Sequence, residues 1–197
     1  MNSQILSKVN YFVKNRLIEL SGILVVLFAI FLFVSISTYS PSDPNFIYTP
    51  ENIDIENFGG FYGSVISDFL LQSIGIVSFF IVLNLLFWGF RLILNKRIIN
   101  FVQKIFFTLV YVSLATTYIN IFFNDSFWLI DNGNGGFVGR IIKENFYFFT
   151  TDIENQYVFY SLFLLTVIFF ILSLSLKLNN IKKIFSFPYL VIIKFIA

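Results

Sequence analysis

Side chains that could carry acid–base or nucleophilic chemistry are scarce in this sequence. It contains no His and no Cys, so the commonest general base and every thiolate ligand or nucleophile are missing. The nearest approach to a nucleophile with a base is Ser64 beside Asp68, one helical turn further along the chain. We expect Asp68 instead to cap or orient the outer end of its helix. The sequence therefore predicts no catalytic residue, no cofactor and no metal site.

A phosphate-binding loop would be another route to chemistry. It requires the pattern Gly-x-x-x-x-Gly-Lys-Ser/Thr, in which backbone amides and a lysine hold the phosphates. No such pattern occurs, and the densest cluster of glycines, 132–139, is followed by Arg140. We therefore expect this chain to perform no ATP chemistry.

Polar residues inside the apolar segments bear on transport, since a transporter or channel subunit is the alternative to a membrane anchor. Such a protein is expected to carry ionisable side chains within the membrane, where a buried charge is costly and marks a substrate or proton path. No charged residue lies near the middle of a long apolar segment. Hydrogen bonds between helices or to the backbone explain uncharged polar residues at this depth more often than ion coordination does. These residues are Asn84, Thr108, Ser113, Thr116, Thr117 and Asn120.

The elements that carry these residues are long apolar runs. Hydrophobic residues make up 57% of the 197 residues and charged residues 12%, whereas soluble domains contain about 25% charged residues. The mean hydropathy is +0.83. About 20 apolar residues are needed for a helix to cross the hydrocarbon core, and four segments approach or exceed that length: 17–38, 69–94, 105–123 and 157–176. We predict an all-α polytopic membrane protein with four transmembrane helices and with short interfacial helices in its two outer loops.

Charge distribution predicts the orientation of this bundle. Eleven of the 13 basic residues lie in or beside three segments, 1–16, 95–104 and 177–197. The segments 39–68 and 124–156 contain ten of the 11 acidic residues. Because cytoplasmic loops are enriched in Lys and Arg, we expect both termini and the 95–104 link in the cytoplasm and the two acidic segments outside. Anionic lipid attracts such basic clusters, so no direct contact with nucleic acid is expected.

The segment after the first apolar run has unusual patterning. Two prolines restrict the residues before them, so the Tyr39–Pro44 stretch is expected to leave the membrane through a stiff, non-helical exit. Asn57 is then expected to cap an amphipathic helix that leads into the second span. Gly60 and Gly63 would share one face of that helix and let another backbone approach closely, although a plain turn at Gly59 and Gly60 explains these glycines nearly as well.

The second outer segment repeats this arrangement. Close-approach glycines and an alternating apolar and charged face follow one another in the 135–144 stretch. Each outer loop is therefore expected to dip a short helix into the interface. The order span, Gly-rich helix, span suggests an approximate internal repeat, although turn formation is the better explanation for Gly133 and Gly135.

These motifs together resemble the N-terminal four-helix membrane domain of the FtsK/SpoIIIE DNA translocases. The most specific element is the Tyr-Ser-Pro-x-Asp-Pro exit directly after the first of four spans. The sequence departs from the family pattern at Ser64, where Ala is usual, and at 155–157, where the fourth helix begins without a glycine. The candidates for structural or interaction roles that follow from the resemblance are Tyr39, Pro41, Asp43, Pro44, Asn57, Gly60, Gly63, Asp68, Gly75, Gly136 and Gly139.

The resemblance implies a role in cell division and chromosome segregation. In that family the membrane domain anchors the protein in the bacterial inner membrane at the division septum and joins the divisome, and a cytoplasmic ATPase further along the chain pumps DNA. The expected partners are the lipid bilayer, divisome membrane proteins and further copies of the chain. Residues 177–197 would begin the linker, with the motor absent, so the chain is expected to be a fragment or a short protein split from its motor.

Overall fold

The computed structural model describes residues 2–47, 54–125, 129, 132–149, 152–174 and 176. Within these residues the chain forms helices and no strand, which confirms the predicted all-α class. The elements, in chain order, are α1 (Asn2–Ser37), α2 (Gly60–Ile74), the 3-10 turn η1 (Gly75–Val77), α3 (Ser78–Asn95), α4 (Phe101–Phe122), α5 (Gly136–Phe149) and α6 (Gln156–Ser173).

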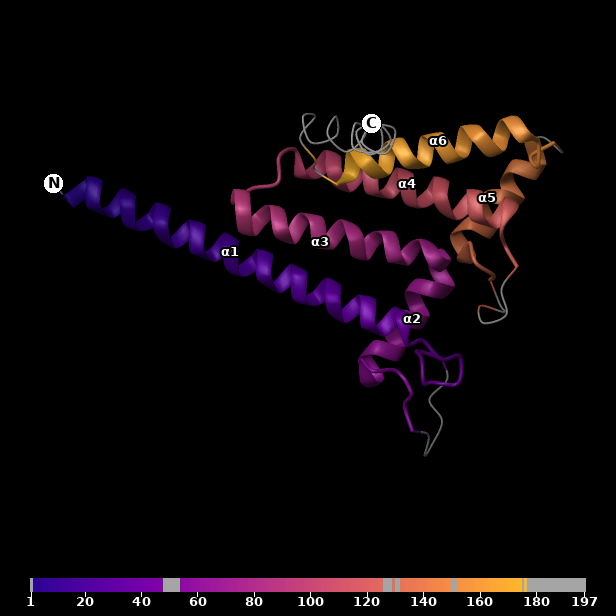
Figure 1. Ribbon diagram of the computed structural model, residues 1–197, viewed down its shortest axis with the longest axis horizontal. Helices are drawn as coiled ribbons and strands as arrows, with labels where there is room; N and C mark the ends of the chain where they lie inside the picture. Colours follow the sequence, from indigo (N-terminus) through magenta and orange to yellow (C-terminus); the bar gives the residue numbers. More distant parts are fainter. Residues whose placement is uncertain are drawn as a thin grey trace, which may run out of the picture.

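The long helices form two antiparallel pairs, α1 with α3 and α4 with α6 (Figure 1). The short helices α2 and α5 lie together at one end of the bundle, here called the loop end, which also holds the described residues 38–47, 54–59, 123–125, 129 and 132–135. The opposite end, here called the turn end, holds the 96–100 link between α3 and α4. Since the link is short, α3 and α4 run in opposite directions.

Four helical segments in the described chain are long and apolar enough to cross a membrane: Ser7–Ser37, Gly60–Asn95, Phe101–Phe122 and Gln156–Ser173. Their outward faces are apolar as well, since Leu24, Phe33 and Leu164 are each more than half exposed. A helix that is hydrophobic around its whole circumference is suited to a lipid environment. The four predicted spans are therefore confirmed in number.

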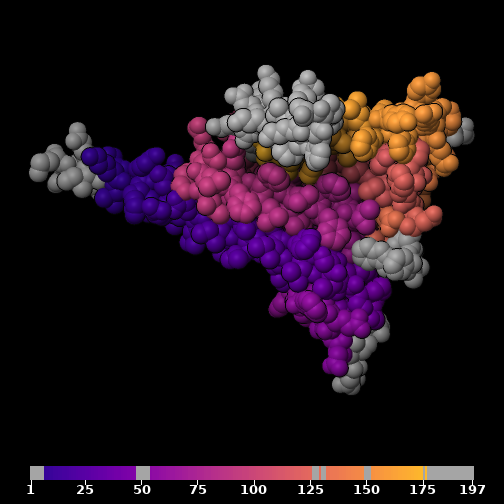
Figure 2. Space-filling view, in the orientation of Figure 1, coloured from indigo at the N-terminus to yellow at the C-terminus, as the bar shows by residue number. Residues whose placement is uncertain are grey.

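The helix boundaries differ from those expected from hydropathy. Helix α1 begins at Asn2, not near residue 17, and its first half projects beyond the end of α3 as an arm (Figures 1 and 2). The arm is a continuation of the spanning helix because neither proline nor glycine interrupts the chain before Gly22. Helix α6, the fourth span, ends at Ser173. The predicted linker at 177–197 lies outside the described residues.

The expected span at 69–94 does not run as a single helix. Helix α2 ends at Ile74, Gly75 takes a φ of +61°, and α3 starts again at Ser78. The break is held from outside, because the amide of Ile76 donates to the carbonyl oxygen of Asn134 (3.0 Å) in the other loop. Hydropathy does not reveal this break, since both sides of it are apolar.

Close backbone contact joins the first helix pair. A Cβ atom on Gly22 would lie 2.9 Å from the carbonyl oxygen of Gly89, and one on Gly89 would lie 2.6 Å from Cγ2 of Val26. Small residues at such crossings let membrane helices approach closely and gain van der Waals contact. Two buried apolar clusters fill the bundle. One, where α1 meets α2 and α3, contains Ala29, Leu32, Ile36, Leu71, Val82 and Leu129. The other, between the α2–η1 break and α4, contains Ile74, Val77, Tyr111, Val112 and Ala115.

A polar node connects α3 with the second pair. The buried Asn84 amide donates to Thr108 Oγ1 (2.9 Å) on α4 and accepts from Ser173 Oγ (2.9 Å) on α6. Trp88 Nε1 donates to the Ser173 carbonyl oxygen (2.9 Å). The expectation that polar groups at this depth bond between helices therefore holds for Asn84 and Thr108.

The two halves of the chain repeat one design. Each contains a spanning helix, a glycine-rich start to a short helix, and a second spanning helix. The starts share the pattern Gly-Gly-Phe-x-Gly, at 59–63 and at 135–139. The second glycine of each has a positive φ, +62° at Gly60 and +66° at Gly136. The first and third glycines of each pack against the preceding spanning helix, at Ser35 in α1 and at Thr116 in α4.

Candidate functional site

The side chain of Asn57 is the centre of a polar junction at the loop end. It is 3% exposed and donates to the carbonyl oxygens of Ser35 (2.8 Å) and Thr38 (3.2 Å), which are left free at the end of α1. Its Oδ1 accepts from the amide of Gly59 (2.9 Å). Asn57 therefore ties the end of α1 to the start of α2.

This arrangement corrects the expected capping role. The N-cap residue of α2 is Gly59, and it makes no side-chain cap hydrogen bond. Asn57 instead bonds the C-terminal carbonyls of α1 and the turn before α2, because the chain folds back onto α1 before the helix starts.

Asp43 secures the same turn from the other side. Its carboxylate is 3% exposed and accepts from two consecutive amides, those of Glu56 and Asn57, both at 2.9 Å. Hydrogen bonds from amides to an ionised carboxylate are stronger than bonds between neutral groups. The exit after α1 is thus closed into a loop whose two ends lie side by side.

The two prolines of the exit have different surroundings. Pro44 is buried and its carbonyl oxygen lies 2.8 Å from Ser64 Oγ, whereas Pro41 is exposed. Ser64 Oγ also lies 2.9 Å from the carbonyl oxygen of Phe61. The Ser64 hydroxyl is therefore bound to the backbone and is not held as a nucleophile by Asp68.

Asp68 lies within α2 and does not cap it, which corrects the second capping expectation. The helix begins eight residues earlier, at Gly60. Tyr39 OH donates to Asp68 Oδ1 (3.0 Å), and Gln72 Nε2 lies 3.4 Å from the same hydroxyl oxygen. Asn132 Nδ2 donates to Gln72 Oε1 (2.8 Å) and so extends the chain of hydrogen bonds to the second loop.

Gly60 and Gly63 have different roles, contrary to the expectation that they share a close-packed face. A Cβ atom on Gly63 would lie 2.4 Å from Asn57 Oδ1 and 2.9 Å from Ser35 Oγ. A Cβ atom on Gly60 would meet nothing within 4 Å, but the positive φ favours glycine there. Gly63 provides space for the junction, and Gly60 provides the turn.

A second junction joins the two halves of the chain through their backbones. Gly75 and Gly136 are in contact, and a Cβ atom on Gly139 would lie 2.3 Å from the carbonyl oxygen of Thr116. Asn134 Nδ2 donates to the carbonyl oxygen of Phe123 (2.9 Å) and so holds the second loop over the end of α4. The predicted glycines Gly75, Gly136 and Gly139 thus all lie at contacts between elements.

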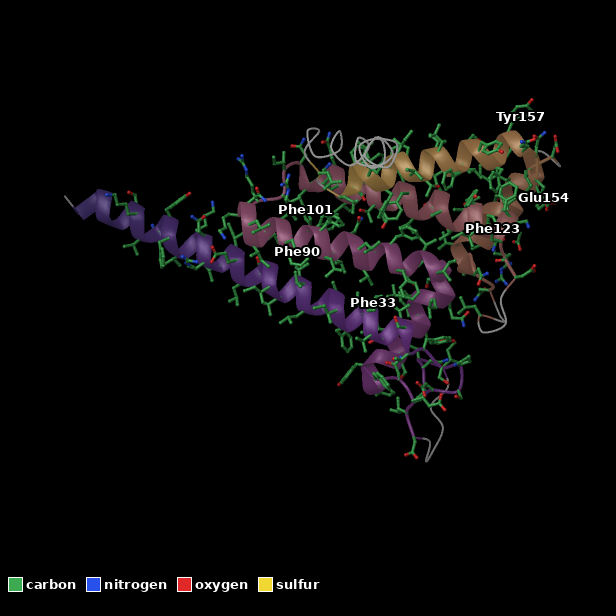
Figure 3. The ribbon with its side chains drawn as sticks, in the orientation of Figure 1. Phe33, Phe90, Phe101, Phe123, Glu154 and Tyr157 are labelled. Atoms are coloured by element: carbon green, nitrogen blue, oxygen red, sulfur yellow. The ribbon has the colours of Figure 1, made fainter. Side chains whose placement is uncertain are left out.

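The region between the last turn of α5 and the start of α6 is more exposed. Tyr147 OH donates to Glu154 Oε1 (2.9 Å), and this hydrogen bond, with burial and the negative charge of Glu154, raises the pKa of Tyr147. Asn155 caps α6 by accepting from the amide of Tyr157 (2.9 Å). The asparagine therefore begins the fourth span at the place where a family glycine was expected. Tyr157 points away from the bundle (Figure 3) and is 84% exposed.

The sequence does not predict four polar residues that take part in the junctions, namely Ser35, Gln72, Asn132 and Asn134. The position of Ser35, one helical turn before Tyr39, is a local signal. The other three depend on contacts between segments that are distant in sequence, so no local signal points to them.

The junctions have the chemistry of a structural clamp. In the described part of the chain, no group of three or more His, Cys, Asp or Glu side chains is placed to hold a metal ion. The buried carboxylate of Asp43 and the amide of Asn57 are engaged by backbone groups. Their effect is to fix the loop end in one conformation.

The comparisons with known proteins agree with this architecture. Residues 14–182 match the family described as the 4TM region of DNA translocase FtsK/SpoIIIE. A protein of Azospirillum brasilense named DNA translocase FtsK is 32% identical over 88 residues, which cover 44% of this chain and 14% of that protein. A protein of the same name from Rickettsia bellii is 30% identical over 171 residues, which cover 85% of this chain and 22% of that protein.

The matched region is thus a small part of each relative, and it is a membrane domain that does not cover the motor portion. No solved structure gives a significant match. The match extends over most of the residues that form the four spans and both junctions. The chain is a membrane protein and belongs to the family of the four-transmembrane region of the FtsK/SpoIIIE DNA translocases.

Proposed function

We propose that this chain is the membrane anchor and divisome-interaction domain of an FtsK-like DNA translocase, acting in cell division and chromosome segregation at the bacterial septum. The observation that carries the proposal is the family match over residues 14–182. The turn end would face the cytoplasm, because Lys8, Lys14, Arg16 and the basic residues of the 96–104 region lie there. A motor that follows the last span would then be on the same side as the chromosome.

The loop end offers the surface for divisome membrane proteins. A groove of about 400 Å³ runs beside Asp68 and Gln72 and is flanked by the side chains of Phe46 and Phe69. Phe46, Phe69 and Tyr62 are between 57% and 75% exposed. Exposed aromatic residues are enriched in protein interfaces. The junctions would hold this surface rigid, and lipids and further copies of the chain would contact the apolar faces of the spans.

No catalytic step is assigned to the chain in this proposal, and the observations do not favour transport. In the described spans, charged side chains lie towards the ends. Lys8, Lys14, Arg16, Glu19, Arg91 and Lys104 lie towards the turn end, and Asp68 lies towards the loop end. Asn84, one of the buried polar residues within the spans, is bonded to side chains of two neighbouring helices. An ion path would instead require ionisable groups facing a cavity.

Localisation tests the proposal. A fluorescent fusion of this chain, expressed at low level in a dividing bacterium, should form a band at the septum. The paired change Tyr62→Ser and Phe69→Ser should reduce the band, since it removes exposed aromatic surface without touching either junction. Tyr157→Ser, which also removes an exposed aromatic side chain at the loop end, is the matched control and should leave the band unchanged. Uniform membrane fluorescence of the parent chain at normal protein level would contradict the proposal.

A further inference from the structure

Two arginines surround one small polar cavity at the turn end. The cavity has a volume of about 110 Å³ and is lined by Arg91 and Asn95 from the last turns of α3 and by Arg97 and Ile99 from the link to α4. Arg91 and Asn95 are four residues apart and therefore lie on the same face of the helix. Two arginines and an asparagine thus line one cavity, and their guanidinium and amide groups can donate hydrogen bonds.

The positive charge at this cavity has no counter-charge in the described chain. Glu19 is the acidic residue on this side of the bundle, and it already pairs with Arg16 and Lys96. Within the described residues, no carboxylate lies within ion-pair distance of Arg91 or Arg97. The sequence from Phe69 to Asn124 contains no Asp or Glu. An anion for this cavity therefore has to come from outside the segment that forms it.

An apolar groove lies beside the same link. It has a volume of about 410 Å³ and its lining consists of Val25, Leu85, Trp88, Leu92, Ile98 and Phe101. Leu92 follows Arg91 in α3, and Ile98 lies between two residues that line the polar cavity. Phe101 stands at the start of α4 (Figure 3), where its ring packs against Trp88 with centroids 5.4 Å apart. Trp88 and Arg91 are three residues apart on α3, so the apolar groove and the polar cavity lie beside each other at the turn end.

We propose that this pair of features is a binding site for an anionic phospholipid. The phosphate would lie between Arg91 and Arg97, whose planar guanidinium groups match phosphate oxygens. An acyl chain of the same molecule would occupy the groove beside Trp88. Basic pockets between membrane helices on the cytoplasmic side bind anionic headgroups. A free phosphate ion would satisfy the arginines but leave the apolar groove unfilled.

Trp88 provides a direct readout. In a Trp128→Phe background, Trp88 is the remaining tryptophan of the chain. The full chain is reconstituted in phosphatidylcholine vesicles that contain a small fraction of either brominated phosphatidylglycerol or brominated phosphatidylcholine. Quenching of Trp88 by the anionic lipid should exceed quenching by the zwitterionic lipid. Each arginine should favour binding of the anionic lipid over the zwitterionic lipid by roughly fivefold. Because both leaflets have the same composition, the result depends neither on orientation in the cell nor on the proposed function.

Two double variants, each lacking two positive charges, test where the preference for the anionic lipid arises. In R91Q with R97Q, the two brominated lipids should quench Trp88 equally. K8Q with K14Q removes two positive charges from the α1 arm instead and should retain the preference for the anionic lipid. R97Q alone changes an exposed residue of the link and should lower the preference without affecting the fold. Equal quenching in the parent, an equal loss in K8Q with K14Q, or complete competition by inorganic phosphate would each overturn the proposal.

Discussion

Gly75 and Gly136 contact each other through their backbones, and this contact joins the two halves of the chain. A Cβ atom on Gly136 would lie 2.5 Å from the backbone nitrogen of Gly75, and one on Gly75 would lie 1.8 Å from the carbonyl oxygen of Asn134. Both glycines have positive φ, +61° and +66°. The amide of Ile76 is thereby free of α2 and donates to Asn134. The break that ends α2 is therefore also the point at which the second loop is attached.

Replacing Gly75 by Ala should be severely destabilising. The new Cβ would overlap the backbone of Asn134, which cannot move without loss of the Ile76 hydrogen bond. This overlap and the strained φ should together reduce the free energy of unfolding by more than about 4 kcal/mol, a loss that few single substitutions cause. Denaturant titration in detergent, followed by circular dichroism, measures this loss of unfolding free energy.

Gly60→Ala is the matched control for that change. Gly60 has a similar φ, +62°, but a Cβ atom there meets nothing within 4 Å. The loss should therefore be confined to backbone strain, about 1–2 kcal/mol. Equal losses in Gly60→Ala and Gly75→Ala would show that the contact with Asn134 does not contribute.

Gly63→Leu should disrupt the first junction, whereas Gly60→Asn should be tolerated. Any side chain on Gly63 displaces Asn57 Oδ1 and Ser35 Oγ, and overpacking of a close contact typically destabilises by about 1–3 kcal/mol or more. Asn adopts the left-handed conformation more readily than other side chains, which suits Gly60. Protease resistance of the loop end in detergent separates the two variants. A Gly63→Leu protein that is as resistant as the parent would contradict the close-packing role.

Asn57→Leu should lower stability because it leaves buried and half-buried backbone groups without partners. The carbonyl oxygens of Ser35 and Thr38 and the amide of Gly59 would each lose a hydrogen bond. Each unsatisfied buried group typically reduces stability by about 1–3 kcal/mol. Asn145→Leu is the control, because the Asn145 side chain is exposed and bonds one carbonyl of its own helix. A thermal midpoint of Asn57→Leu equal to that of Asn145→Leu would refute the role of the junction.

The sequence predicts the spans well and the junctions only in part. Apolar runs of about 20 residues have few alternatives to a membrane helix, so their number follows from hydropathy. The pairing of Asp43 with the 56–57 amides, and of Gln72 with Asn132, depends on how loops fold over the helix ends. The break at Gly75 is likewise imposed by Asn134, 59 residues later in the numbering. Such contacts between distant segments leave no periodic pattern in the sequence.

Two buried polar residues of the spans should respond in opposite directions. Asn84→Leu removes the hydrogen bonds to Thr108 and Ser173 and should lower stability by about 1–2 kcal/mol, since each bond between membrane helices contributes roughly 0.6 kcal/mol and at most about 1.7. Tyr111 OH is buried without a hydrogen-bond partner in the structure, so Tyr111→Phe removes an unsatisfied group and should leave stability unchanged or raise it by about 1 kcal/mol. The stabilities of the two variants are compared by their denaturation midpoints, measured in the same detergent. A clear loss of stability in Tyr111→Phe would reveal a partner for the hydroxyl group.

The proposed orientation predicts which positions an impermeant thiol reagent reaches in intact cells. The chain contains no Cys, so each introduced cysteine is the single reactive group. Cysteines at Lys8 on the α1 arm and at Gln103 in the first turn of α4 should be protected, because basic residues gather at this end of the bundle. Cysteines at Tyr62 in α2 and Glu144 in α5, both exposed at the loop end, should be labelled. All four should react once the membrane is permeabilised, which controls for burial. Labelling of the Lys8 and Gln103 positions, with protection of the other two, would invert the orientation and place a motor that follows α6 on the side opposite the chromosome.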